Sequence, residues 1–329
     1  MCSSDLPMSG HDATPLSVVL PVLNELDNLE PLHARLTEAL EPMGREYEVI
    51  YVDDGSTDGS WEGLKKIAAR DRRVRLVRFR RNFGQTSALA AGLAYSRHPI
   101  LVTLDADLQN DPADIPRLVE RLGDSYDVVA GWRRHREDPW LTRLLPSHVA
   151  NFLVRLVSGV PLHDFGCTLR VYRREIVQDL SLYGEMHRFL PVLAQEVGGR
   201  VTELEVVHHP RTHGVSKYSV LRTYKVLVDI ITLKFIGDFQ SRPTYVFGGF
   251  GLFALMLGFL ALDVVAYRVF VLGRLEATPM VFLMVIFFLT GVFSLFIGFL
   301  AEIVIRGFHH TQRKPTYHVR ETVGVDRTG

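Results

Sequence analysis

Short apolar runs alternate with amphipathic stretches through the first part of the chain. The runs are rich in Val, Ile and Leu, which predicts buried strands at residues 17–23, 47–52, 74–79, 100–104 and 126–130. Between them, apolar side chains recur at helical spacing, which predicts helices from Glu25 to about residue 40 and at residues 60–69, 84–95 and 113–122. Strands and helices that alternate at this spacing indicate right-handed βαβ crossovers and a mostly parallel sheet. The predicted fold class is therefore α/β.

The hydrophobic pattern changes after residue 218. Two stretches, at about residues 245–267 and 280–302, are apolar and almost free of charge, and each is long enough to cross a membrane. Residues 218–241 are apolar but interrupted by charges, which predicts amphipathic helices in the membrane interface. More Lys and Arg flank the two stretches than lie between them, which favours cytoplasmic flanks. The tail after Arg306, which includes KPTY at residues 314–317, is expected to be extended and to return along the cytoplasmic domain.

Polar clusters follow three of the predicted strands. They read PVLNE at residues 21–25, DDGSTDG at residues 53–59 and DADLQ at residues 105–109. Open α/β sheets bind ligands at the carboxyl ends of their strands, so we expect the three clusters along one edge. The alternative is that each cluster is only a capped turn, because Asp, Ser, Thr and Gly all favour turns.

The third cluster carries the strongest chemical signal. Asp105 and Asp107 with Gln109 offer two carboxylates and an amide oxygen, which suit Mg²⁺ or Mn²⁺. Asn110 or Asp111 is placed to cap a helix that begins near Pro112. A divalent ion held here would neutralise a diphosphate as it leaves.

Composition excludes several classes. The formal net charge is zero over 329 residues, which gives no general electrostatic case for binding nucleic acid. The chain has only two cysteines and therefore no disulfide framework. The sequence has no G-x-G-x-x-G and no G-x-x-x-x-G-K-[ST], so dinucleotide-binding and P-loop folds lack their phosphate cradle. Residues 1–15 are polar and Ser-rich, which predicts a disordered tail.

These motifs, taken together and in order, resemble those of the GT-A glycosyltransferases of family 2. Further signatures are RNFGQ at residues 81–85, DFGCTLR at residues 164–170 and RTHGVSKY at residues 211–218. Over residues 16–320 the chain is similar to polyprenyl-phosphate glycosyltransferases, such as dolichol-phosphate mannose synthase and the bacterial undecaprenyl-phosphate glucosyl and 4-deoxy-4-formamido-arabinose transferases. The resemblance implies a Rossmann-like GT-A domain at residues 16–217, interfacial helices at 218–241, two transmembrane helices within 242–304 and a cytoplasmic tail at 305–329.

The resemblance also implies roles for individual residues. The nucleotide-sugar contacts would be Pro21, Leu23, Glu25, Val52, Asp54, Asp105, Ala106 and Arg133. The metal ligands would be Asp105, Asp107 and Gln109. The phosphate contacts of donor or acceptor would be Arg170, Arg188, Arg211 and Lys217. The family usually has Tyr where Leu23 stands, so one ring contact is absent here.

The candidate catalytic residues are Asp107, Arg133 and Asp164. Asp164 is either a base or a residue that orients the substrate, with Arg170 as its candidate partner. A phosphate acceptor is already anionic near neutral pH, so the reaction needs no strong base.

The implied activity is inverting transfer of a sugar from a nucleotide diphosphate sugar to a polyprenyl phosphate. A UDP-sugar and undecaprenyl phosphate are favoured, with Mg²⁺ or Mn²⁺, at the cytoplasmic face of the inner membrane. One alternative is a processive polysaccharide synthase, which usually needs more spans and a Q-x-x-R-W motif that the sequence lacks. The other is a non-catalytic membrane adaptor, which has no use for the intact motifs. The donor sugar stays open, as does a homo-oligomer such as the tetramers of similar bacterial enzymes.

Overall fold

The computed structural model describes most of the chain. The described residues are 14–134, 151–152, 154–156, 158–178, 180, 186–209, 243–271, 273, 279–311 and 317–325. They belong to two compact units, the first of residues 1–230 with 315–329 and the second of residues 231–314. The whole of the predicted interfacial segment at 218–241 lies outside the described residues, as do Arg211 and Lys217.

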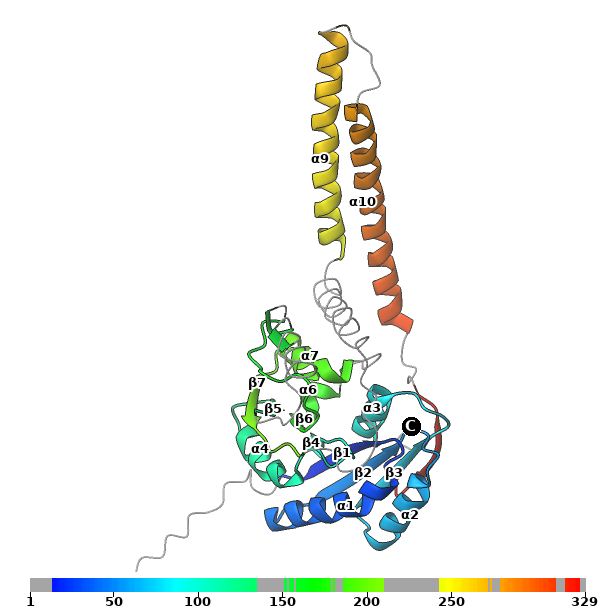
Figure 1. The fold of residues 1–329 in the computed structure, drawn as a ribbon, viewed down its shortest axis with the longest axis vertical. Coiled ribbons are helices and arrows are strands. Elements are labelled where there is room, and N and C mark those ends of the chain that lie inside the picture. The colour runs from blue at the N-terminus through cyan, green and yellow to red at the C-terminus, as the bar shows by residue number, and fades with distance from the viewer. Residues whose placement is uncertain are drawn as a thin grey trace, which may run out of the picture. The chain divides into compact units, whose positions relative to one another are not determined.

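One mixed sheet forms the centre of the first unit (Figure 1). In the described part of the chain it has eight strands, in the order β7-β5-β6-β4-β1-β2-β3-β8. The strands are β1 (Leu16–Val22), β2 (Tyr47–Asp53), β3 (Val74–Phe79), β4 (Ile100–Thr103), β5 (Val128–Trp132), β6 (Arg170–Arg173), β7 (Val201–Glu205) and β8 (Val319–Val323). The pairs β1–β2, β1–β4, β2–β3 and β5–β7 are parallel, whereas β6 and β8 pair antiparallel with their neighbours. The predicted α/β class is confirmed, and β6, β7 and β8 are additions to the predicted strands.

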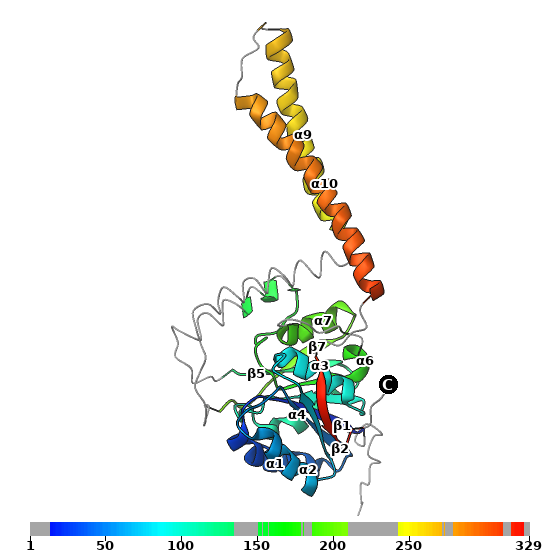
Figure 2. The same ribbon diagram turned by 90° about the vertical axis from the view of Figure 1, so that its right-hand side faces the viewer.

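Helices cover both faces of the sheet (Figures 1 and 2). One face carries α1 (Leu26–Leu40), α2 (Ser60–Arg70) and α4 (Ile115–Leu122), and the other carries α3 (Gln85–Tyr95), α6 (Arg174–Val177) and α7 (Leu190–Glu196). Helix α1 buries a stripe of leucines at helical spacing against the sheet, from Leu29 to Leu40. Helix α3 instead packs through small residues. A Cβ atom at Gly92 would overlap Val19, so glycine allows α3 to approach the sheet closely.

Two helices begin later than the sequence predicts. The helix expected from residue 84 begins at Gln85, because Gly84 has a φ of +95° and lies outside the helical region. The helix expected from residue 113 is preceded by a 3₁₀ turn, Pro112–Asp114. The Asp111 side chain accepts a hydrogen bond from the Ala113 N–H at 3.0 Å, which confirms Asp111 as the predicted cap.

The C-terminal segment completes the sheet edge. Strand β8 pairs antiparallel with β3, with Leu76 opposite Val323. Just before it, the Tyr317 ring stacks on Phe79 with a centroid distance of 4.9 Å. The chain that follows the second unit therefore returns as a strand of the first, where the sequence predicted an extended tail.

The second unit consists of two long helices. Helix α9 is Pro243–Phe270 and α10 is Pro279–Thr311. Within them, Phe247–Phe270 and Pro279–Ala301 are long and apolar enough to cross a membrane, with mean hydropathies of 2.1 and 2.7. Only 22% and 11% of their most apolar windows are buried, unlike the core helices of a soluble domain. Helix α10 extends past the predicted residue 302, and no proline follows until Pro315.

Candidate active site

The three polar clusters lie at one edge of the sheet. Strands β1, β2 and β4 are adjacent and parallel, so their carboxyl ends meet there. In register, Pro21 stands beside Val52 and Val22 beside Asp53. The Leu104 N–H, next to the third cluster, donates to the Val19 carbonyl at 3.2 Å. This juxtaposition is the one that the strand-end pattern predicts.

The first two clusters are interlocked by hydrogen bonds. The Asn24 N–H donates to Ser56 Oγ at 2.9 Å, and the Thr57 N–H donates back to Asn24 Oδ1 at 2.8 Å. The next two backbone N–H groups, at the start of α1, donate to Ser60 Oγ at 3.0 Å and to Asp58 Oδ2 at 3.1 Å. Much of DDGSTDG is therefore a turn that also caps α1, as the alternative interpretation of this motif holds.

Asp53 and Asp54 are buried carboxylates that accept hydrogen bonds from the protein. Asp53 Oδ1 accepts from the Ser56 N–H at 2.9 Å. The two oxygens of Asp54 accept from the Phe83 N–H at 2.7 Å and from the Gly84 N–H at 3.0 Å. Burial raises the pKa of Asp54, and these two hydrogen bonds only partly oppose the rise. A carboxylate has further lone pairs, so the predicted contact of Asp54 with a nucleotide base stays a prediction.

Asp105 and Asp107 stand at the end of β4 in a tight turn. Gln85 Nε2 donates to Asp105 Oδ1 at 2.6 Å, and the Gln109 N–H donates to Asp107 Oδ1 at 3.2 Å. Leu108, which lies between Asp107 and Gln109, has a φ of +59°, a conformation that L-residues seldom adopt. Desolvation and repulsion by the Asp107 charge raise the pKa of Asp105 to about 7, against opposing effects of Thr168, Arg133 and Gln85.

This carboxylate pair fits a divalent cation that also binds substrate. Among the described residues, no group of three or more His, Cys, Asp or Glu side chains is placed to hold a metal ion. Mg²⁺ and Mn²⁺ sites in nucleotide enzymes need no such cage, because one or two carboxylates suffice when substrate phosphates and water complete the shell. A cation would also relieve the repulsion that raises the pKa of Asp105.

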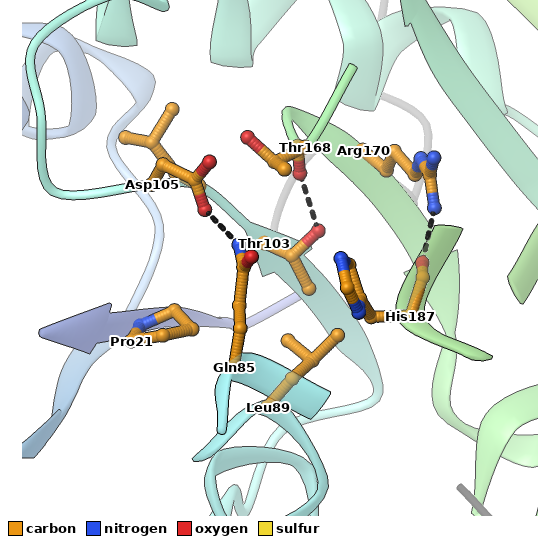
Figure 3. A pocket seen from close by; sticks show the side chains of 9 residues that line it. Pro21, Gln85, Leu89, Thr103, Asp105, Thr168, Arg170 and His187 are labelled. Atoms are coloured by element: carbon orange, nitrogen blue, oxygen red, sulfur yellow. Dashed lines mark hydrogen bonds between the residues drawn. The ribbon is translucent and has the colours of Figure 1, made fainter. Parts of the chain in front are cut away.

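A small pocket opens beside Asp105 (Figure 3). It has a volume of about 20 Å³, room for about one water molecule. Its lining residues are Pro21, Gln85, Leu89, Thr103, Leu104, Asp105, Thr168, Arg170 and His187. The Thr103 hydroxyl donates to the Thr168 carbonyl at 2.7 Å, which ties β4 to the segment before β6. Strands β1, β4 and β6 and helix α3 thus all contribute to the lining of the pocket beside Asp105.

Arg133 and Asp164 form a bidentate ion pair. Arg133 Nε lies 2.7 Å from Asp164 Oδ2, and Nη2 lies 3.0 Å from Oδ1. Asp164 is buried and also accepts from the Gly166 N–H at 2.9 Å. A Cβ at Gly166 would come within 2.8 Å of Arg133 Nη2, so glycine leaves room for the guanidinium. This geometry favours an orienting role for Asp164 over that of a base.

Arg170 occupies a different place from the one expected. It was the candidate partner of Asp164, but that carboxylate pairs with Arg133. The Arg170 guanidinium is buried and donates to the carbonyls of Phe165, His187 and Arg188 at 2.6, 2.8 and 3.2 Å. Both terminal nitrogens of Arg170 donate to backbone carbonyls. This arrangement does not favour the predicted contact of Arg170 with a phosphate. The side chain of Arg188 is half-buried and stays a candidate.

The remaining predicted contacts differ in exposure. Leu23 is exposed and Glu25 half-buried, whereas Val52 in β2 and Ala106 in the turn after β4 are buried. The Val52 side chain lies against α3, because a Cβ at Gly92 would be 3.3 Å from its Cγ2. Any contact of Val52 with a base would therefore come from its backbone.

The chain leading to the predicted phosphate loop is fastened to the carboxylate turn. The His209 N–H donates to the Gln109 carbonyl at 2.8 Å, and His209 Nε2 lies 2.9 Å from Asp111 Oδ2. Asn110 and His208 form an isolated antiparallel bridge. Arg211 follows His209 by two positions in the sequence.

Sequence reasoning did not assign Gln85, Thr168 or His187 to the site. RNFGQ was recognised only as a motif, without a role for its glutamine. A glutamine at the start of a helix is ordinarily a surface residue. Its partner Asp105 belongs to a different element, the turn after β4. The one signal in the sequence was the place of Gln85 directly after a glycine that follows a predicted strand.

Comparisons with known proteins agree with this architecture. Residues 17–181 match the sequence family described as Glycosyl transferase family 2. A dodecaprenyl-phosphate galacturonate synthase of Rhizobium johnstonii is 39% identical over 93% of this chain and 92% of its own. An undecaprenyl-phosphate 4-deoxy-4-formamido-L-arabinose transferase of Edwardsiella ictaluri is 36% identical over 95% of both chains.

The fold is also similar to that of a solved glycosyltransferase. Glucosyl-3-phosphoglycerate synthase of Mycobacterium tuberculosis, in complex with Mn²⁺, UDP and phosphoglyceric acid, aligns with a TM-score of 0.53. The alignment covers 68% of this chain and 78% of that chain, with 20% sequence identity. At this identity the likeness establishes the GT-A fold alone.

Proposed function

Because the chain belongs to glycosyl transferase family 2, we propose that it transfers one sugar from a nucleoside diphosphate sugar to a polyprenyl phosphate. Relatives named for this kind of reaction are similar over more than nine-tenths of the chain. Two helices long and apolar enough to span a membrane are in keeping with a lipid-borne acceptor. The donor we favour is a UDP-sugar, and the acceptor undecaprenyl phosphate.

The observation that carries the proposal is the Asp105–Asp107 pair beside Arg133. The Arg133 charge lowers the pKa of Asp105, so this guanidinium lies within electrostatic reach of the pair. Two carboxylates and one arginine at a strand end match the needs of a diphosphate leaving group. Asp105 and Asp107, with Gln109, would hold Mg²⁺ or Mn²⁺, which when bound neutralises negative charge on the diphosphate.

The chain's own residues would divide the remaining work. Asp164 holds the Arg133 guanidinium in one orientation, and Arg133 is proposed to bind a donor phosphate from that position. Pro21, Leu23, Glu25, Val52, Asp54 and Ala106 are proposed to line the nucleotide. Arg211 and Lys217 are proposed to bind phosphates of donor or acceptor, with Arg188 as a further candidate.

The reaction we propose needs no covalent intermediate. An oxygen of the acceptor phosphate attacks the anomeric carbon, and the bond from that carbon to the donor diphosphate breaks on the opposite side. The configuration inverts, and the nucleoside diphosphate leaves with the bonding electrons. Because the attacking phosphate is already anionic, the orienting role of Asp164 is sufficient.

The proposal extends to the placement of the chain. Residues 16–217 would form the catalytic domain, residues 218–241 would lie in the interface, and 242–304 would hold two spans. Positive charges on both flanks favour a cytoplasmic domain at the inner membrane. Residues 305–329 would stay on the same side, in keeping with the pairing of β8 with β3 in the first unit.

A donor panel tests the proposed function. The full chain, purified in detergent, is given undecaprenyl phosphate, Mn²⁺ and a series of UDP- and GDP-sugars, and the lipid products are read by mass spectrometry. We expect one monoglycosylated lipid phosphate from a UDP-sugar. A long polymer would overturn the proposal in favour of a processive synthase. Nucleotide binding without any product across the panel would overturn it in favour of a non-catalytic adaptor.

A further inference from the structure

Gln85 is one of two described side chains, with Thr168, that hydrogen-bond to the Asp105 carboxylate. It is the first residue of α3, and its Nε2 donates to Asp105 Oδ1 at 2.6 Å. Figure 3 shows the amide reaching from the helix start to the end of β4. The contact joins parts of the sheet edge that are separate in sequence, so it depends on how α3 begins.

The second polar cluster holds the start of α3 in place. Asp54 accepts from the N–H groups of Phe83 and Gly84, the two residues before Gln85. Gly55, with a φ of +78°, lies so close to this turn that a Cβ would be 2.7 Å from the Arg81 carbonyl carbon. The 53–55 segment therefore sets the path of the chain into α3.

The other side of the same helical turn is fixed by a buried contact. Thr86 Oγ1 and His187 Nδ1 lie 2.7 Å apart, and both residues are buried. Gln85 thus stands between two anchored neighbours, which limits the positions that its amide can take. A side chain held in this way imposes its geometry on its partner.

A neutral donor suits this position. An arginine or lysine here would pair with Asp105 and compete with a cation for the carboxylate, whereas an amide donates one hydrogen bond without adding charge. A carboxylate has about four lone-pair sites, so the hydrogen bonds from Gln85 and Thr168 do not use up its capacity to bind a metal ion. A carboxylate that another carboxylate repels also needs such a restraint to keep a single orientation.

We propose that Gln85 is a positioning residue, which orients Asp105 toward the divalent cation of the donor complex and is itself held by Asp54 through the 83–84 turn. This inference rests on the proposed function. It gives the RNFGQ motif a task, and it makes part of DDGSTDG a support for the metal ligand.

The test compares nucleotide binding with and without metal. Titration calorimetry measures the affinity of the full-length protein in detergent for UDP, once with Mn²⁺ and once with EDTA. Gln85→Met keeps the length of the side chain and removes the donor. We expect the affinity for UDP with Mn²⁺ to fall about tenfold or more, and that with EDTA to stay unchanged. Gln195→Met, at an exposed position of α7, is the matched control and should change neither.

The outcomes separate this inference from the proposed function. A wild-type protein that binds neither UDP nor GDP with Mn²⁺ would overturn the proposed function. A wild-type protein that binds UDP with Mn²⁺, and a Gln85→Met variant that binds it equally well, would overturn only the role of Gln85. An equal loss with Mn²⁺ and with EDTA would also overturn it, because a merely structural residue has that effect.

A second variant protects the test against misfolding. Gln85→Asn keeps a polar amide that is well tolerated at a helix start, but its side chain is one methylene too short to reach Asp105. If Gln85→Met does not fold, Gln85→Asn should show the same selective loss of the metal-dependent affinity. Wild-type affinity in a folded Gln85→Asn variant would overturn the inference.

Discussion

Two pairs of aspartates end neighbouring strands of the same sheet and yet differ in what surrounds them. Asp53 and Asp54, after β2, accept hydrogen bonds from the backbone N–H groups of Ser56, Phe83 and Gly84. Asp105 and Asp107, after β4, stand close enough that the charge of one raises the pKa of the other. The Asp53 charge also raises the pKa of Asp54, but burial and the two backbone hydrogen bonds have larger effects there, whereas repulsion by Asp107 is second only to burial in raising the pKa of Asp105. That repulsion, more than the count of acidic residues, indicates which pair binds a cation.

The largest expected effect comes from the second pair. Asp107→Asn should lower the rate of sugar transfer by about 10²–10³-fold, because it removes a carboxylate from the proposed cation site. The thermal unfolding temperature should remain close to wild type, since the substitution is isosteric. The assay is lipid-linked sugar formation, with Asp124→Asn at an exposed position as the matched control. A metal-dependent Asp107→Asn variant with wild-type activity would contradict the assignment.

A third carboxylate, Asp164, differs from both pairs because it forms an ion pair with Arg133. Asp164→Asn should lower kcat/KM by about tenfold to a hundredfold, and Arg133→Lys should have a similar effect. The double variant should lose little more than either single one, because both act through one ion pair. An Asp164→Asn effect that adds fully to that of Arg133→Lys would contradict this account. The loss of one limb of the pH–rate profile would instead favour Asp164 as a base.

A substitution in the first pair, Asp53 and Asp54, should affect the stability of the fold more than it affects sugar transfer. Asp54→Asn leaves one of the N–H groups of Phe83 and Gly84 facing an amide nitrogen, which should lower the free energy of unfolding by about 1–3 kcal/mol. Chemical denaturation of wild type and variant at equal pH measures the difference. The affinity for UDP in EDTA tests the predicted base contact separately. A loss of that affinity with unchanged stability would show that Asp54 acts on the base rather than on the turn.

The smallest expected effect is a pH dependence of ligand stabilisation. The folded-state pKa of Asp105 is raised to about 7, so the protonated carboxyl is favoured below that pH and its stabilising contribution is lost as pH rises through it. A cation needs the deprotonated form, so Mn²⁺ with UDP should raise the unfolding temperature more at pH 7.5 than at pH 5.5. Equal stabilisation at both pH values, with binding saturated, would contradict the shift.

Strands β1 to β5 could be predicted from the sequence, whereas β6, β7 and β8 could not. Strands β1 to β4 are runs of Val, Ile and Leu buried on both faces, and such runs are visible without knowledge of the fold. Strand β6 reads RVYR and β7 reads VTELE, so charge hides them. Strand β8 pairs with β3 across most of the chain length, which no local pattern records.

The site followed the same division. Asp105 and Asp107 were predicted because a strand end and a D-x-D motif are both local signals. The contact between Gln85 and Asp105, and the pairing of Arg133 with Asp164, join residues 20 and 31 positions apart. Sequence reasoning therefore found the chemical groups, and the structure was needed to show which of them hold the others.

The central claim is that the carboxylate pair after β4, and not the pair after β2, binds the divalent cation of a nucleotide complex. Anomalous diffraction at the manganese edge, from crystals of the full chain grown with Mn²⁺ and UDP, tests it most directly. We expect one strong peak within coordination distance of Asp105 and Asp107, next to the UDP diphosphate. A peak beside Asp53 and Asp54, or bound UDP without any peak near Asp107, would contradict it.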